Sequence, residues 1–354
     1  MASAAESSLG GGGLMALVQH SVKSKTFALY TKAVHTFISF ALGRRLDLST
    51  DAQIDQAITA YITNRHDAYQ LWLDDDGESD PSRRPPHASL GEMEHLLAGC
   101  EFFTPSLKSR LGLSHRATKA WRKLHPVEHH PPLNWPLTLV IAVCLAKGGR
   151  RDMSIAVILA FDCYFRISEF TEMLVAHVVP DSHTDRVAIR LPTTKSRDND
   201  SVVVARPDVA RLLVRHIAGR SALDRVFNFS QAEFRIAFHS ACATLGLHGS
   251  YVPHSLRGGG ATHDFAVMDA SSVDINHIMI RGRWSSAKSL FTYCRAGQSL
   301  LLKVRESPAL MATGQAIAST LYDTMSKLCL EPAECAAPHS SSTSVPQVGV
   351  GRRP

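Results

Sequence analysis

The sequence lacks three features that would each place it in another class of protein. No apolar run approaches the roughly 20 residues that a membrane-spanning helix needs. The seven cysteines are scattered and include no Cys-x-x-Cys pair, which excludes a disulfide framework and a zinc knuckle. The start, MASAAESSLGGGG, has neither the basic nor the apolar segment of a secretory signal. These absences predict a protein of a reducing, intracellular compartment with no membrane partner.

A metal site has one weak candidate. His125, His129 and His130 lie in the segment HPVEHHPPLNWP, and the first two are four residues apart. Two prolines follow them, and no cysteine adds a ligand at the spacing that metal sites use. The pattern favours a histidine-rich linker, so we expect neither a metal ion nor another cofactor.

Positive charge is concentrated in two stretches. The net charge is +6 and the pI is near 9.0, which fits a polyanionic partner such as double-stranded DNA. Residues 104–151 carry nine Lys and Arg against one acid, and residues 281–305 carry six against none. A solvated basic face explains either stretch alone. If the two stretches bind DNA, the residues expected to contact phosphates are Arg116, Lys119, Arg122, Lys123 and Arg283.

The chain of 354 residues is long enough for two domains. Apolar periodicity and capping patterns predict a small all-helical unit of about four helices, separated by the proline-rich segment from a second unit that mixes helices with one hairpin. The expected fold class is therefore mainly α with a small β-sheet (α+β). The expected divisions are a tail at 1–13, a helical domain at 14–124, a linker at 125–136, a second domain at 137–330 and a tail at 331–354.

The second domain contains the parts needed to attack a phosphodiester without a metal. Two arginines, Arg166 and Arg257, can neutralise the non-bridging oxygens, because a guanidinium offers forked donors and keeps its charge. Tyr293 can serve as the nucleophile if these cations favour its phenolate. Lys195, in the predicted hairpin turn, can protonate the departing 5′ oxygen as a general acid. His254, three residues before Arg257, can bind the phosphate or support the site.

Two further residues complete the set. Trp284 lies nine residues before Tyr293 and is expected to bind or buttress the phosphate, and Glu169 is expected to orient an arginine. Each residue has a plainer explanation as a core or surface group, and Tyr293 alone would be read as a core tyrosine. The order and spacing of the whole set within positions 166–293 favour a catalytic constellation.

These boxes resemble those of the tyrosine recombinases, the family of phage integrases. Arg166-Ile-Ser-Glu169 is similar to the first arginine box, His254-Ser-Leu-Arg257 to the His-x-x-Arg box, and GRWSSAKSLFTY to the box that ends at the nucleophile. The resemblance spans about residues 137–300, and the preceding helical unit resembles the core-binding domain of that family. It implies a two-domain clamp on DNA, a 3′-phosphotyrosyl bond at Tyr293, and strand exchange in a homotetramer without ATP or metal.

Two details qualify the resemblance. Gly258, Gly259 and Gly260 follow Arg257 inside a predicted helix, where they allow a close backbone approach to DNA or a neighbouring helix, or else loosen Arg257. The segment WRKLHPVEHHPPLNWP and the tryptophan of the last box resemble recombinases of eukaryotic mobile elements. We therefore expect a nuclear location for a eukaryotic source and a cytoplasmic one otherwise. The competing interpretations are a DNA-binding protein that has lost cleavage and a type IB topoisomerase.

Overall fold

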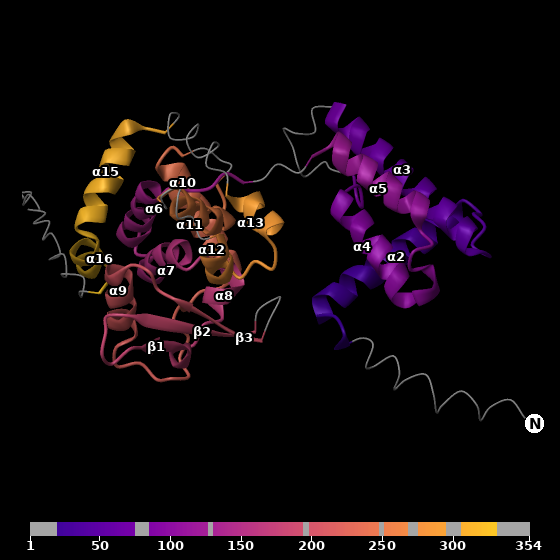
Figure 1. Cartoon of the computed structure of the whole chain (residues 1–354). Helices are drawn as coiled ribbons and strands as arrows, with labels where there is room; N and C mark the ends of the chain where they lie inside the picture. The colour runs from indigo at the N-terminus through magenta and orange to yellow at the C-terminus, as the bar shows by residue number, and fades with distance from the viewer. Residues whose placement is uncertain are drawn as a thin grey trace, which may run out of the picture. The chain divides into compact units, whose positions relative to one another are not determined.

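The chain forms two compact units, residues 1–128 and residues 129–354 (Figure 1). The computed structural model describes residues 20–74, 85–126, 130–193, 198–247, 251–267, 275–294 and 306–330. Lys195 and the two expected terminal tails lie outside these residues.

The first unit is helical throughout its described residues. Its helices are α2 (Ser24–Gly43), α3 (Asp51–Asp74), α4 (Leu90–Phe103) and α5 (Gly112–Leu124), with a short 3₁₀ turn η2 (Pro105–Leu107) before α5. Their inner faces pack a core around Phe37, Ile58, Tyr61, Leu96 and Trp121. This arrangement leaves the basic face of α5 in solvent, because only Ser114, Thr118 and Trp121 of that helix are buried.

A buried carboxylate joins α3 to the start of α5. Asp55 is 6% exposed, and its oxygens accept hydrogen bonds from the backbone of Leu113 at 2.8 Å, the backbone of Ser114 at 2.9 Å and the Ser114 hydroxyl at 2.6 Å. Burial alone would raise the pKa of Asp55, but these hydrogen bonds lower it below its usual value. Asp55 thus caps a helix that begins 57 positions further along the chain.

The second unit combines helices with one small sheet. Its elements are α6 (Trp135–Lys147), α7 (Arg151–Asp162), α8 (Ile167–Thr171), η3 (Val175–His177), β1 (Val178–Pro180), β2 (Val187–Thr193), β3 (Asp198–Val203), α9 (Pro207–Ile217), α10 (Gln231–Thr244), α11 (His254–Val267), α12 (Ile275–Gly282), α13 (Ala287–Tyr293), α15 (Pro308–Ser319) and α16 (Leu321–Cys329). The fold class predicted from the sequence, mainly α with a small sheet, is confirmed.

Helix α7 forms the centre of the second unit. Each residue from Met153 to Asp162 is buried, so the helix is surrounded by other elements rather than lying on a surface. It packs against α6, α9, α11 and α16. Helices α13 and α15 lie on opposite sides of this central group (Figure 1). The end of α7 therefore emerges inside the unit, where the first arginine box follows.

The sheet is antiparallel in the order β1-β2-β3. Ile189 pairs with Val178 on one side and with Val202 on the other. The β2–β3 hairpin was expected, whereas β1 was not, because three residues give too short a pattern to detect.

One boundary differs from the expectation. Trp135 and Pro136, placed in the linker, form the first turn of α6, since Asn134 caps that helix by accepting a hydrogen bond from Leu137 N at 2.9 Å. Near the end of the described chain, α15 and α16 meet at Thr320. Among the helices that the structure describes, none has the length and apolarity to span a bilayer.

We expect Asp55→Asn to destabilise the first unit by about 1 to 3 kcal/mol, because an amide cannot accept all three hydrogen bonds. The depressed pKa of Asp55 makes its contribution complete above the unfolded-state pKa, and the contribution is lost as pH falls through the folded-state value. Urea unfolding at neutral and acidic pH measures both effects. The variant should show the larger loss at neutral pH, and Asp67→Asn, an exposed change on the same helix, should show neither.

Candidate active site

Arg257 is completely buried and is bound by two backbone carbonyls. Its terminal nitrogens donate to the carbonyl oxygens of Tyr164 and Gly282. Its guanidinium carbon lies 4.4 Å from the ring centre of Trp284 and 5.8 Å from that of Tyr293. Burial lowers the pKa of Arg257, and the positive charge of Arg166 adds to this effect. The guanidinium still carries its charge near neutral pH, because its ordinary pKa is far higher.

The glycine run after Arg257 lets α11 approach its neighbours closely. A Cβ at Gly259 would lie 2.1 Å from the Leu133 carbonyl oxygen, and one at Gly260 would lie 2.1 Å from the Phe161 carbonyl oxygen. At Gly258 the nearest atoms would be 3.9 Å away, an ordinary contact. The close approach anticipated for this run is therefore to α7 and to the segment before α6. It fixes the depth at which Arg257 is buried.

Two residues beside Arg257 have left-handed backbones. Tyr164 has φ of 50° and Arg283 has φ of 57°, a conformation that costs a residue other than glycine about 1 to 3 kcal/mol. The turn at Tyr164 directs its carbonyl oxygen toward both Arg257 and Arg283. The strained backbone at Tyr164 and Arg283 thus helps to place the guanidiniums of Arg257 and Arg283.

Glu169 connects two arginines. Its Oε1 accepts a hydrogen bond from Arg166 Nη1 at 2.6 Å, and its Oε2 accepts from Arg283 Nη2 and from the Arg166 backbone, each at 2.8 Å. The Glu169 side chain is 6% exposed, whereas that of Arg166 is 28% exposed. Arg166 is therefore held on one side and open to solvent on the other.

Trp284 folds back over the preceding turn. A Cβ at Gly282 would lie 1.7 Å from the indole ring, so only glycine fits there. The ring is 7% exposed, and its Nε1 has no hydrogen-bond partner within the described part of the chain. A buried donor without an acceptor costs roughly 1 to 3 kcal/mol, which makes Nε1 a candidate to bind an anionic oxygen.

His254 and Tyr293 meet through their polar atoms. His254 Nε2 lies 3.2 Å from the Tyr293 hydroxyl, and the ring centres are 5.3 Å apart. Partial burial of the imidazole lowers the pKa of His254, and the charges of Arg257 and Arg166 contribute in the same direction, although another part of the residue stays in contact with solvent. The neutral imidazole is the dominant form near pH 7, and it can accept a hydrogen bond from the phenol.

A hollow of about 470 Å³ opens beside these groups. It is lined by Arg166, Arg283, Trp284, Ser285, Ser289, Thr292 and Tyr293. Two guanidiniums and four hydroxyl-bearing side chains are among the groups that line it, so the hollow can accept an anion. The open side of Arg166 and the Tyr293 ring both contribute to its wall.

The structure brings together six of the residues predicted from the sequence: Arg166, Glu169, His254, Arg257, Trp284 and Tyr293. Lys195 lies outside the described residues. The position of Arg283 does not match its expected role as a DNA contact. It is 9% exposed, and its terminal nitrogens bind carbonyl oxygens and Glu169.

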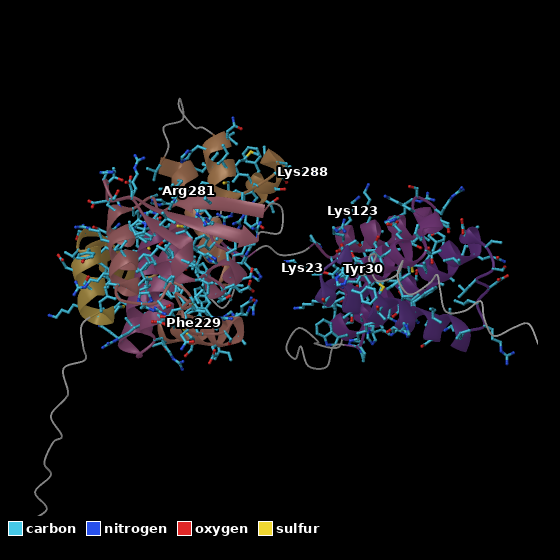
Figure 2. All side chains as sticks on the ribbon, turned by 90° about the horizontal axis from the view of Figure 1, so that it is seen from below. Lys23, Tyr30, Lys123, Phe229, Arg281 and Lys288 are labelled. Atoms are coloured by element: carbon cyan, nitrogen blue, oxygen red, sulfur yellow. The ribbon has the colours of Figure 1, made fainter. Side chains whose placement is uncertain are left out.

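The four basic residues predicted on α5 are exposed in the first unit. They are Arg116, Lys119, Arg122 and Lys123, and Lys123 is labelled in Figure 2. Arg122 forms an ion pair with Glu94. Lys119 and Lys123 form no ion pair with any residue that the structure describes.

The sequence did not reveal two residues that support the candidate site, one through its backbone carbonyl and one through buried ion pairs. Tyr164 contributes a carbonyl, which no side-chain pattern reveals. Asp162 is completely buried and pairs with Arg206 at 2.6 Å and with Arg281 at 3.4 Å. The sequence contained one sign of these ion pairs, because Asp162 ends the apolar run of α7 and a buried carboxylate needs a partner.

Within the described ranges, no three His, Cys, Asp or Glu side chains gather in a way that could hold a metal ion. His130 is described but His129 is not. The described groups of the candidate site are thus guanidiniums, an imidazole, an indole and a phenol, with Glu169 as their carboxylate.

Comparison with known proteins places this geometry in a known fold. No family model and no curated protein sequence matches the chain. A crystal structure of a lambda integrase dimer bound to a COC′ core site matches with a TM-score of 0.50 at 13% identity, over 80% of this chain and 92% of that chain. The fold is that of a tyrosine recombinase.

Two further solved structures are similar over comparable lengths. A second lambda integrase dimer on a COC′ core site has a TM-score of 0.48 at 13% identity, covering 82% of this chain and 83% of that chain. The XerA recombinase has a TM-score of 0.37 at 16% identity, covering 78% and 99% respectively.

Single alanine substitutions test whether Gly258, Gly259 and Gly260 are needed for close helix packing. Gly259→Ala and Gly260→Ala should each destabilise the protein by about 1 to 3 kcal/mol, since backbone atoms must move to admit the Cβ. Gly258→Ala should be neutral or stabilising by up to about 1 kcal/mol, because alanine favours the helix and meets no close atom. Thermal unfolding of the three variants is the measurement. Equal effects at all three positions would show that the run does not work by close packing.

Proposed function

We propose that the chain is a site-specific DNA recombinase that cleaves and rejoins double-stranded DNA through a 3′-phosphotyrosyl bond at Tyr293. The observation that carries the proposal is the meeting of the Tyr293 hydroxyl with His254, 3.2 Å away, at a hollow that Arg166 and Trp284 line. A phenol is a poor nucleophile unless a neighbouring base or cation favours its anion. Here both kinds of group are adjacent.

The proposed reaction assigns a role to each group. The Tyr293 oxygen attacks the scissile phosphorus, forming a P–O bond to tyrosine as the bond to the 5′ oxygen breaks. Neutral His254 accepts a hydrogen bond from the phenol and guides its proton out, and solvent is the final proton acceptor, because the lowered pKa keeps the imidazole neutral but makes it a weak base. Arg166 and the Nε1 donor of Trp284 stabilise charge on the non-bridging oxygens, and the buried Arg257 adds its positive charge from behind the hollow. Lys195 protonates the departing 5′ oxygen.

Rejoining reverses these steps. A 5′ hydroxyl from a second strand attacks the phosphotyrosyl phosphorus, and Tyr293 leaves. The ester retains the energy of the broken bond, so the proposed cycle needs neither ATP nor metal. The first unit supplies basic residues on α5 for phosphates of the duplex. Exchange between two duplexes calls for an assembly of several protomers, which we propose to be a tetramer.

The binding-only alternative was motivated by the glycine run. That run packs α11 closely and leaves Arg257 bound by two carbonyls. The arrangement therefore supports an intact site rather than a decayed one.

Tyr293→Phe should abolish covalent attachment to DNA while leaving DNA binding nearly unchanged, because only the hydroxyl is lost. The measurement is a denaturing gel of the full-length protein incubated with duplex fragments from the regions that flank its gene. Tyr322→Phe, on the distant helix α16, serves as the matched control and should form the adduct like the unmodified protein.

Each other outcome of that gel has a definite meaning. An adduct that persists in Tyr293→Phe would assign the nucleophile to another residue. Binding without any adduct, across all flanking fragments, would favour the protein that binds DNA without cleaving it. Relaxation of a supercoiled plasmid without exchange of partners would favour a topoisomerase.

Replacing Lys119 and Lys123 together with glutamine should weaken DNA binding and flatten its salt dependence. Loss of two phosphate contacts reduces the slope of log K against log salt by about 1.8. Fluorescence anisotropy with a labelled duplex at several salt concentrations measures this slope. Arg122→Gln should have a smaller effect, since Arg122 is already paired with Glu94. An unchanged slope in the double variant would remove α5 from the interface.

A further inference from the structure

We propose that Arg283 is a positioning residue of the candidate active site, which acts on Arg166 through Glu169. It fixes the direction in which Arg166 presents its guanidinium, and it restores the positive charge that Glu169 would otherwise cancel. This inference rests on the proposed function, because it concerns how the same site holds a phosphodiester.

Arg283 lines the hollow, but its terminal nitrogens already bind protein oxygens, which favours a supporting role over a direct one. Its Nη2 donates to Glu169 at 2.8 Å and to the Tyr164 carbonyl at 3.1 Å, and its Nη1 donates to the Arg281 carbonyl at 3.1 Å. Its side chain is 3% exposed. Both terminal nitrogens are thus occupied by protein oxygens, and the guanidinium is fixed in place before DNA arrives.

Glu169 transmits the position of Arg283 to Arg166. One carboxylate oxygen binds the Arg166 side chain, and the other binds Arg283 together with the Arg166 backbone. A carboxylate held at both oxygens cannot rotate without breaking one of these bonds. The orientation of Arg166, which alone of the two arginines keeps an open side, therefore depends on Arg283.

Charge gives a second reason for an arginine at this position. Without Arg283, the guanidiniums of Arg166 and Arg257 and the carboxylate of Glu169 would carry one net positive charge. Arg283 raises this to two at and behind the hollow. A phosphodiester under attack concentrates negative charge on its non-bridging oxygens. The net positive charge of the site therefore stabilises the transition state more than the ground state.

The backbone conformation gives no reason for an arginine at position 283, so the reason lies in the contacts of its side chain. Arg283 has φ of 57° in the turn between α12 and α13, a region where glycine is the least strained residue. Glycine would make the turn easily, but it would leave Glu169 with Arg166 as its partner and remove one cation from the site.

The test compares Arg283→Met and Arg283→Lys in the full-length protein, with Arg235→Met as the control. Arg235 is an exposed arginine of α10 that contacts Gln231. The readouts are the rate of adduct formation at saturating DNA, using the flanking fragment that traps the unmodified protein, and the Kd for the same fragment. Arg283→Met should slow the adduct by about 100-fold with little change in Kd, Arg283→Lys should restore part of the rate, and Arg235→Met should change neither.

The coupling through Glu169 is read from a double-mutant cycle. Arg283→Met should slow adduct formation far less in a Glu169→Gln background, because the connection to Arg166 is already broken. Equal slowing in both backgrounds would overturn the proposed route. If Arg283→Met proves unstable, Arg283→Gly removes the guanidinium while suiting the left-handed turn, and a rate equal to that of the unmodified protein would overturn the proposal.

Orthovanadate, which imitates a phosphate under attack, separates this inference from the proposed function. Its binding to the protein without DNA is measured by isothermal titration calorimetry. We expect weaker binding by Arg283→Met and unchanged binding by Arg235→Met, whether or not any DNA fragment gives an adduct. Absence of an adduct with the unmodified protein would contradict the proposed function alone. No difference between Arg283→Met and the unmodified protein in either measurement would overturn the positioning role.

Discussion

The second unit depends on burying the charged guanidinium of Arg257. An unpaired charge in the interior of a protein is strongly unfavourable, so its donors need fixed acceptors. Two backbone carbonyls supply them, from Tyr164 after α7 and from Gly282 at the end of α12. Helix α11 reaches these carbonyls because Gly259 and Gly260 remove the side chains that would separate the backbones. One side chain thereby ties together three segments that are distant in sequence.

A second polar network supports the same segments from behind. Asp162, the last residue of α7, accepts hydrogen bonds from Arg206 at 2.6 Å and from the Ala205 backbone at 2.7 Å, and it also pairs with Arg281. The Arg206 guanidinium stacks 4.3 Å from the ring centre of Trp135. The start of α9 and the end of α12 are thus both attached to the end of α7. Because Tyr164 follows two residues later, this network also fixes the carbonyl that Arg257 needs.

The sequence predicted most of the side chains that the structure brings together at the candidate site, because these residues carry recognisable types at local spacings. His254 and Arg257 share one helical turn, and Trp284 and Tyr293 flank one short helix. It could not show that Arg283 points inward, since an arginine in a basic run is usually solvated and only the distant Glu169 decides otherwise. The glycine run was ambiguous for the same reason. Its meaning depends on carbonyl oxygens from Leu133 and Phe161, which no local pattern contains.

Low sequence identity and a shared fold are compatible here for a physical reason. A core accepts many apolar residues if volume and pattern are kept, so a chain that is 13% identical to lambda integrase can share its fold. A fold shared at that level says where a site can form and leaves open what it does. The case for cleavage therefore comes from this chain's own atoms: a phenol beside a neutral imidazole, and an arginine held by a carboxylate that a second arginine secures.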